Sequence, residues 1–226
     1  MSDSKEILNV GVLGLGTVGG GVVSALQSSP EFFNSRAGKH IEVVAACVRN
    51  PKKIRPALEI NFPVTSNPLD VIEDPNIDLV LELIGGLEPA RKLVLKALNN
   101  GKNVVTANKA LLATHGEEIF RLAAKKNCFV GYEAAVAGGI PIIKVIREGL
   151  VANKITKLHG IINGTCNYIL TGMEKSQSAF DDILIEAQKK GFAEEDPTFD
   201  IGGIDAAHKL AILASLLFSV PLGLGN

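Results

Sequence analysis

ILNVGVLGLGTVG, residues 7–19, joins an apolar run to a glycine-rich turn. The run predicts a buried strand over 7–13, and the residues after the turn predict a helix over 18–27. The turn is a G-x-G-x-x-G motif, whose glycines permit a tight turn, a close approach to a pyrophosphate and close packing of helix on strand. It predicts a dinucleotide-binding loop, although a glycine-rich turn can also be purely structural. The residues of this loop are Gly14, Leu15, Gly16, Thr17, Val18 and Gly19.

The sequence that follows alternates short apolar runs with helical stretches as far as residue 132. Strands separated by helices are typical of βαβ units, which form a parallel sheet with helices on both faces. We therefore predict an α/β fold with a Rossmann-type, doubly wound parallel sheet. Its further strands are expected over 41–48, 77–84, 103–106 and 128–132, and its further helices over 89–99 and 109–126.

The pattern changes near residues 133–140, where GYEAAVAGGIP supplies the glycines and the proline of a connector. We place a domain boundary here, between a first domain over 1–135 and a second over 136–226. In the second domain we expect a helix over 141–150, a strand over 154–162 and a last helix over 204–219.

The composition is that of a folded protein without a strong charge. Of 226 residues, 46% are hydrophobic and 21% charged, enough apolar side chains to bury a core. With 23 Lys and Arg against 24 Asp and Glu, the formal charge of −1 argues against a nucleic-acid partner or a polybasic membrane surface. We expect no signal peptide and no membrane span. Three cysteines without a CxxC pair indicate a reducing, cytoplasmic setting.

The end of the second predicted strand bears on the choice of cofactor. An NAD site usually has an acidic residue there for the ribose 2′-hydroxyl, whereas this sequence has Cys47-Val48-Arg49-Asn50. The Arg49 guanidinium can pair with a 2′-phosphate, so NADP(H) is favoured and NAD(H) stays possible. The alternative is an ordinary solvated loop arginine.

The stretch VVTANK, residues 104–109, ends another predicted strand at the sheet edge where this fold binds ligands. Thr106 is the last residue of that strand. Lys109 opens the next helix, where the helix dipole disfavours a cation. This placement indicates a functional lysine, and an exposed first-turn lysine is the alternative.

Acidic residues gather within GFAEEDPTFDIGGID, residues 191–205, which lacks the spacing of an EF-hand. A solvated acidic loop is their ordinary interpretation. In the following apolar helix, which we expect to be buried, Asp205 and Lys209 share one face. They form either a functional ion pair or a surface pair at the exposed end of the helix. His208 is expected on a polar face, and Cys166 in packing.

Several long motifs in order make the sequence similar to homoserine dehydrogenases over essentially its whole length. They are GLGTVG (14–19), ELIGG (82–86), GKNVVTANKALLA (101–113), YEAAVAGGIPII (132–143), GIINGTCNYIL (160–170) and GFAEEDPTFDIGGIDAAHKLAILA (191–214). The resemblance implies NAD(P)H-dependent interconversion of L-aspartate 4-semialdehyde and L-homoserine, on the route to threonine, methionine and isoleucine. It makes the second domain part of an α+β substrate-binding and dimerisation domain.

The resemblance also implies roles for single residues. Lys209 matches the catalytic lysine, which would protonate the developing alkoxide, and Lys109 matches a second lysine beside nicotinamide and substrate. Glu194 and Asp205 match the homoserine-binding acids, and Asp200 lies in the same acidic wall. The residues of an implied structural sodium site are Glu133, through its carboxylate, and Val136, Gly138 and Ile140, through main-chain oxygens.

Two other interpretations stay open. One is a Rossmann oxidoreductase that acts on a related semialdehyde or another amino-acid-derived carbonyl. The other is a non-catalytic NADP(H)-binding or regulatory module. In the family the catalytic region continues beyond the residue that matches Asn226, so we expect the chain to lack part of the second domain. Members of the family are commonly homodimers when full length.

Overall fold

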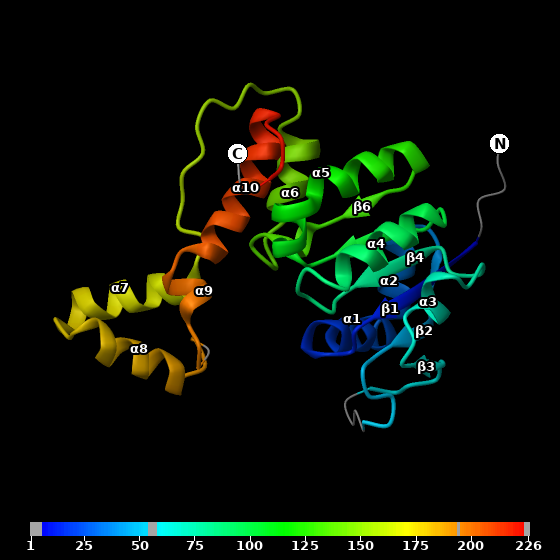
Figure 1. Ribbon diagram of the computed structural model, residues 1–226, viewed down its shortest axis with the longest axis horizontal. Coiled ribbons are helices and arrows are strands. Elements are labelled where there is room, and N and C mark those ends of the chain that lie inside the picture. Colours follow the sequence, from blue (N-terminus) through cyan, green and yellow to red (C-terminus); the bar gives the residue numbers. More distant parts are fainter. Residues whose placement is uncertain (1–5, 54–57, 194, 224–226) are drawn as a thin grey trace.

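A parallel sheet forms the centre of the N-terminal part of the chain (Figure 1). The structure is a computed structural model that describes residues 6–53, 58–193 and 195–223. Within these residues the strand order is β3-β2-β1-β4-β5-β6, which reverses direction beside β1 and confirms the predicted doubly wound α/β fold. The strands are β1 (Ile7–Leu13), β2 (His40–Cys47), β3 (Val64–Thr65), β4 (Leu79–Glu82), β5 (Asn103–Thr106) and β6 (Val130–Gly131).

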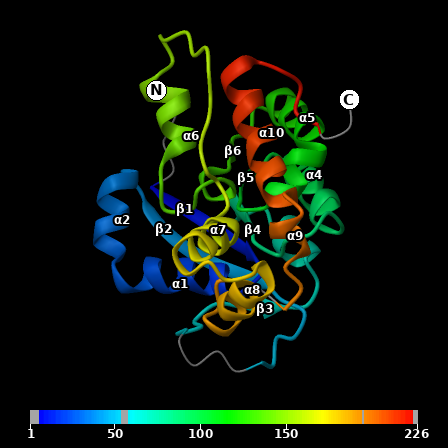
Figure 2. The ribbon, with the colours of Figure 1, turned by 90° about the vertical axis from the view of Figure 1, so that its left-hand side faces the viewer.

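Helices cover both faces of the sheet (Figure 2). On one face lie α1 (Thr17–Ser28) and α2 (Pro30–Ala37), and on the other α4 (Ala90–Asn99) and α5 (Lys109–Lys126). Successive strand residues point to opposite faces, so β1 contributes to two cores. Val10 and Val12 pack with Val23 of α1, whereas Leu13 belongs to the core that holds Leu111.

The predicted elements of this part agree with the observed ones within a few residues. The bounds of β5 and α5 are those expected, and β6 is shorter than its predicted range. Three short elements were not predicted, namely α2, β3 and α3 (Leu69–Ile72). With two to eight residues each, they are too short to show a hydrophobic period.

The strand predicted over 154–162 is wrong. After the 3-10 turn η1 (Glu133–Ala135), helix α6 (Ile142–Lys144) continues into a π-helical turn, η2 (Val145–Gly149). The chain then makes a long arc to α7 (Figure 1), and residues 154–163 have no regular secondary structure. Val151 is 75% exposed and Ile161 79%. An extended segment becomes a strand only when a neighbour pairs with its backbone, and the described residues supply none here.

The C-terminal part is helical. Helices α7 (Gly164–Ser176) and α8 (Phe180–Lys189) form a hairpin that projects away from the sheet (Figure 1). After α9 (Thr198–Ile201), helix α10 (Ile204–Phe218) returns to pack beside α5, where Ile212 and Leu213 join its core. Helix α10 occupies the range predicted, but it is not buried on nearly every face, because Leu210 is 51% exposed.

None of the helices in the described ranges combines the length and the apolar character that crossing a membrane requires.

Candidate active site

The glycine loop between β1 and α1 leaves no room for side chains at two of its glycines. A Cβ on Gly14, whose φ is +102°, would lie 2.7 Å from the Leu83 carbonyl oxygen. A Cβ on Gly19 would lie 1.9 Å from the Gly14 carbonyl oxygen. At Gly16, by contrast, a Cβ would meet open space, and no side chain caps the N-terminus of α1 there. The first amides of α1 therefore face an open position suited to a phosphate.

The end of β2 lies beside this loop. The Gly14 amide donates to the Cys47 carbonyl oxygen (2.9 Å), so the last residue of β2 is bonded to the first glycine of the motif. Arg49 follows two residues later at the same sheet edge, and its side chain is exposed. The guanidinium thus has the freedom to reach a ligand bound at the glycine loop.

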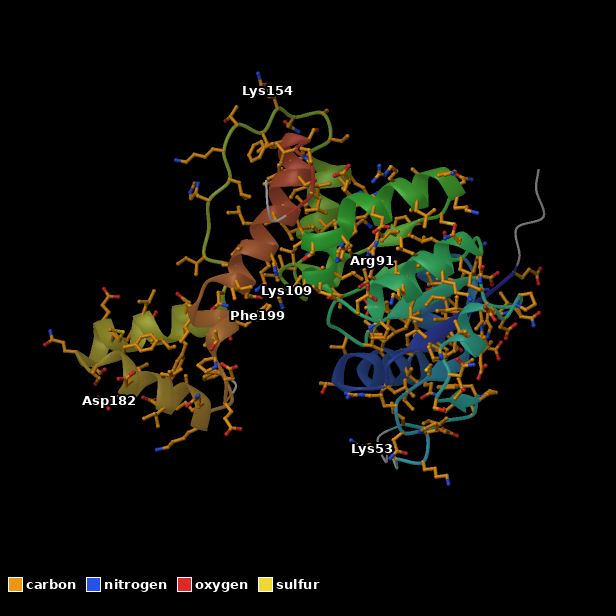
Figure 3. All side chains as sticks on the ribbon, viewed as in Figure 1. Lys53, Arg91, Lys109, Lys154, Asp182 and Phe199 are labelled. Carbon is orange, nitrogen blue, oxygen red and sulfur yellow. The ribbon has the colours of Figure 1, made fainter. Side chains whose placement is uncertain are left out.

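Lys109 lies at the start of α5, as predicted. Asn108 caps this helix, because its Oδ1 accepts from the Leu111 amide (3.0 Å). The Lys109 Nζ lies 3.1 Å from Asp205 Oδ1 of α10. Figure 3 shows Lys109 at the junction of the sheet-containing and helical parts. The second residue predicted here, Thr106, is buried, and its hydroxyl donates to Glu82 Oε2 (2.6 Å).

Asp205 and Lys209 form a largely buried ion pair and not a surface pair. The Lys209 Nζ donates to Asp205 Oδ2 (2.6 Å) and to the Ile162 carbonyl oxygen (2.7 Å). Asp205 is 5% exposed. Its two carboxylate oxygens are therefore shared between two ammonium groups, one from α5 and one from α10 itself. The Asp205 carboxylate therefore contacts both Lys109 and Lys209, which lie far apart in the sequence.

The pKa of Asp205 reflects this environment. Burial of the carboxylate raises the pKa, but hydrogen bonds from Lys209, Asn163 and Lys109, with the charge of Lys109, outweigh burial. The pKa of Asp205 consequently lies below its ordinary value, and the group is ionised at neutral pH.

Asn163 organises the acidic wall, although we did not single it out from the sequence. Its Nδ2 donates to Asp200 Oδ1 (2.8 Å) and to Asp205 Oδ2 (2.9 Å), and its Oδ1 accepts from the Cys166 amide (2.7 Å). The Thr165 hydroxyl donates to the second oxygen of Asp200 (3.0 Å). An asparagine before a helix is a sequence signal for an N-cap, which Asn163 is for α7, but this signal does not reveal its contacts with the carboxylates.

These residues line one cavity of about 990 Å³, between α7 and the start of α10. The polar residues of its lining include Asn163, Thr165, Asp200, Asp205 and Lys209. The predicted substrate residues Asp200 and Asp205 thus lie side by side next to Lys209. Glu194, the third predicted acid, lies outside the described residues.

His208 does not lie on a polar face, as we had predicted. Only 7% of the residue is exposed, and its ring packs edge-on against Phe199, 5.5 Å between centroids. Among the described residues its Nδ1 has no hydrogen-bond partner. Burial lowers the pKa of His208, Lys109 lowers it further, and Asp205 opposes this. The prediction failed because α9 covers the helix face that the sequence period leaves polar.

Cys166 packs beside the acidic wall, in agreement with its predicted role. Its Sγ donates to the Asp200 carbonyl oxygen (3.3 Å). Burial raises the pKa of the thiol, and the charges of Asp200 and Asp205 raise it further. The thiol is therefore protonated at neutral pH and is not an activated nucleophile.

Glu133 of the implied sodium site caps α6. Its two carboxylate oxygens accept from the Ile143 and Lys144 amides, both at 2.9 Å. The other three residues of the site follow in an irregular turn, in which Ala137 and Gly139 have positive φ. The described part of the chain contains no group of three His, Cys, Asp or Glu side chains able to hold a metal, so a cation here would depend on main-chain oxygens.

The structure combines a doubly wound sheet, an open glycine loop at the end of its first strand, and a lysine-carboxylate cluster where the start of α5 meets α10. These features define an α/β protein of the dinucleotide-dependent oxidoreductase class. Sequence models of known families agree. The NAD-binding domain of homoserine dehydrogenase matches residues 14–133, and homoserine dehydrogenase matches residues 141–226. The chain belongs to the homoserine dehydrogenase family.

Individual relatives support this membership. A homoserine dehydrogenase from Pseudomonas aeruginosa is 55% identical over 95% of the chain and 49% of its own length. The crystal structure of one from Thiobacillus denitrificans superimposes with a TM-score of 0.92 at 58% identity, over 96% of the chain and 50% of that protein. A hyperthermophilic archaeal homoserine dehydrogenase in complex with NADPH superimposes with a TM-score of 0.81 at 28% identity, over 95% of the chain and 71% of that protein. The chain spans about half the length of the curated relatives it matches.

Proposed function

We propose that the chain carries out the NADP(H)-dependent interconversion of L-aspartate 4-semialdehyde and L-homoserine, a step toward threonine, methionine and isoleucine. The observation that carries this proposal is the position of Asp205 between the ammonium groups of Lys109 and Lys209. The cluster joins the part that holds the glycine loop to the carboxylate-lined cavity. The proposed reaction needs both the glycine loop and the cavity. The hydride donor and the amino-acid substrate must lie next to each other, with a cationic group beside the carbonyl oxygen.

The residues have complementary parts in the aldehyde reduction. The glycine loop over 14–19 would hold NADPH, which would supply the hydride for the carbonyl carbon. Lys209 donates the proton that the carbonyl oxygen takes up, and Lys109 offsets the negative charge that develops on that oxygen. Asp205 holds both ammonium groups in place. Asp200 and Asp205, with Glu194 as a proposed third acid, bind the α-ammonium of the substrate.

The test is NADPH oxidation with aspartate semialdehyde, with the full-length Pseudomonas relative as positive control. We expect absorbance at the NADPH band to fall only when both substrates are present. NADPH affinity is measured separately by fluorescence. Binding without turnover would favour the non-catalytic module, and turnover restricted to another semialdehyde would favour the related oxidoreductase.

We propose NADP(H) rather than NAD(H) as the preferred cofactor, because Arg49 is exposed beside the glycine loop. The archaeal neighbour solved with NADPH supports this preference. Replacing Arg49 by alanine is expected to weaken NADPH binding about tenfold, the loss of one charge-assisted contact, and to leave NADH binding unchanged. Two fluorescence titrations measure this. Arg121→Ala, on an exposed position of α5, is the matched control, and equal weakening of both cofactors would contradict the assignment.

We also propose a structural Na⁺ at Glu133 and the main-chain oxygens of Val136, Gly138 and Ile140. The support is the chemistry of the donors, since hard cations prefer oxygen ligands. Each carboxylate oxygen of Glu133 accepts one amide and keeps a lone pair for a cation. The ion would hold the connector that follows η1. The homodimer, the cytoplasmic location and the domain boundary at residues 135 and 136 stay predictions.

A further inference from the structure

Glu82 is a buried carboxylate that the proposed reaction does not use. It is the last residue of β4, at the ligand-binding edge of the sheet, and it is fully buried. Its Oε2 accepts from the Thr106 hydroxyl (2.6 Å), and its Oε1 accepts from the Ile84 and Gly85 amides (3.1 and 3.2 Å). Burial of a carboxylate is costly unless its oxygens are hydrogen-bonded, so these partners indicate a position that the fold maintains.

On one side, Glu82 shapes the loop that packs against the dinucleotide loop. Gly85 and Gly86 both have φ of +73°, which curls the backbone so that two successive amides point at Oε1. Such a concave arrangement of amides binds an anion, which here is the carboxylate of the preceding strand. Leu83 opens this loop, and its carbonyl oxygen is the atom that a Cβ on Gly14 would strike. A shift of the loop would therefore move the wall of the glycine loop.

On the other side, Glu82 is connected to Lys109. The Thr106 hydroxyl that donates to Glu82 also accepts from the Asn108 amide (2.9 Å). The Asn108 side chain in turn donates to the Gly86 carbonyl oxygen (2.7 Å), which closes a ring of hydrogen bonds back to the loop. Its Oδ1 caps α5, the helix that Lys109 begins.

We propose that Glu82 is a positioning residue, which holds the loop over 83–86 and the turn at Asn108 and Lys109 in one fixed geometry. The Glu82 carboxylate would thereby fix the position of Lys109 relative to Leu83, whose carbonyl oxygen forms the wall of the dinucleotide loop. The inference rests on the proposed function, which explains why the dinucleotide loop and Lys109 would need a fixed arrangement. Because Glu82 is fully buried, we assign it no contact with the substrate or the reacting atoms.

The experiment replaces Glu82 by glutamine, which keeps the size of the side chain but turns one accepting oxygen into a donor. We expect NADPH affinity to fall about tenfold, because a charge-assisted hydrogen bond is lost from the loop. We also expect an amine reagent to label Lys109 several-fold faster relative to exposed Lys154, because Lys109 loses its fixed contact with Asp205. Peptide mass spectrometry gives the labelling ratio.

The controls separate positioning from folding. Glu117→Gln removes a carboxylate from the exposed side of α5 and is expected to change neither quantity. If Glu82→Gln does not fold, as judged by its thermal melt, Thr106→Val is the second variant: it keeps the carboxylate and its bonds to the Ile84 and Gly85 amides, but removes the hydroxyl that connects Glu82 to Asn108. A folded variant with the unsubstituted labelling ratio would overturn the proposal, as would failure of both variants to fold, which would make Glu82 purely structural.

Failure of the proposed function has a different signature. If the unsubstituted chain does not bind NADPH, the proposed function is contradicted, whereas the labelling ratio still tests the connection between Glu82 and Lys109. Labelling requires neither cofactor nor turnover.

Discussion

Replacing Lys209 by alanine is expected to slow the reduction of aspartate semialdehyde about a thousandfold, the contribution of a positioned proton donor. The affinity for NADPH is expected to change little, because Lys209 contacts Asp205 and the Ile162 carbonyl oxygen in the helical part and not the glycine loop. The prediction therefore separates chemistry from cofactor binding. Its measurements are the turnover number under saturating substrates and the dissociation constant of NADPH.

A second substitution distinguishes the proton from the charge. Lys209→Arg keeps a cation beside Asp205, but a guanidinium does not release its proton at neutral pH. We expect this variant to bind the substrate better than Lys209→Ala and to remain about as slow. Lys96→Ala removes an exposed lysine of α4 that pairs with Glu73; it is the control and should keep full activity. An active Lys209→Ala enzyme would rule out Lys209 as the proton donor.

The nucleotide-binding part could be predicted from the sequence because its signals are local. The apolar run over 7–13 and the glycines that follow predict a strand, a turn and a helix within a short window, and β5 and α5 follow the same logic. The strand predicted over 154–162 failed for the opposite reason. Its apolar residues are compatible with a strand, but strand formation depends on a partner elsewhere in the chain.

The site could be predicted only in part. Spacing on one helix indicates the Asp205–Lys209 pair, but no local signal shows that Lys109 reaches the other oxygen of Asp205. Asn163 and Glu82 were missed because their roles depend on partners distant in the sequence. His208 was misplaced because α9, which precedes α10, turns at Gly202 and Gly203 and brings Phe199 against the His208 ring.

Replacing Asp205 by asparagine is expected to lower the free energy of unfolding by about 3 kcal/mol at neutral pH. The neutral amide would leave two ammonium groups facing each other without the carboxylate between them. The value is at the lower end for a broken buried ion pair, because the side chains of Lys209 and Lys109 are 18% and 35% exposed and keep some hydration. Urea denaturation measures the change, and Asp181→Asn, on the exposed face of α8, is the control.

The pH dependence of that difference identifies its cause. The pKa of Asp205 is lower in the folded chain than in the unfolded chain, where it is about 3.9. A carboxylate with a depressed folded pKa contributes stability that is fully present above its unfolded pKa and is lost as the pH falls through its folded pKa. The difference in the free energy of unfolding between the unsubstituted chain and Asp205→Asn should therefore be constant from neutral pH to about pH 5 and become smaller below about pH 4. A difference in the free energy of unfolding that stays the same in acid would mean that Asp205 stabilises the fold through shape and neutral hydrogen bonds, such as that from Asn163, and not through its charge.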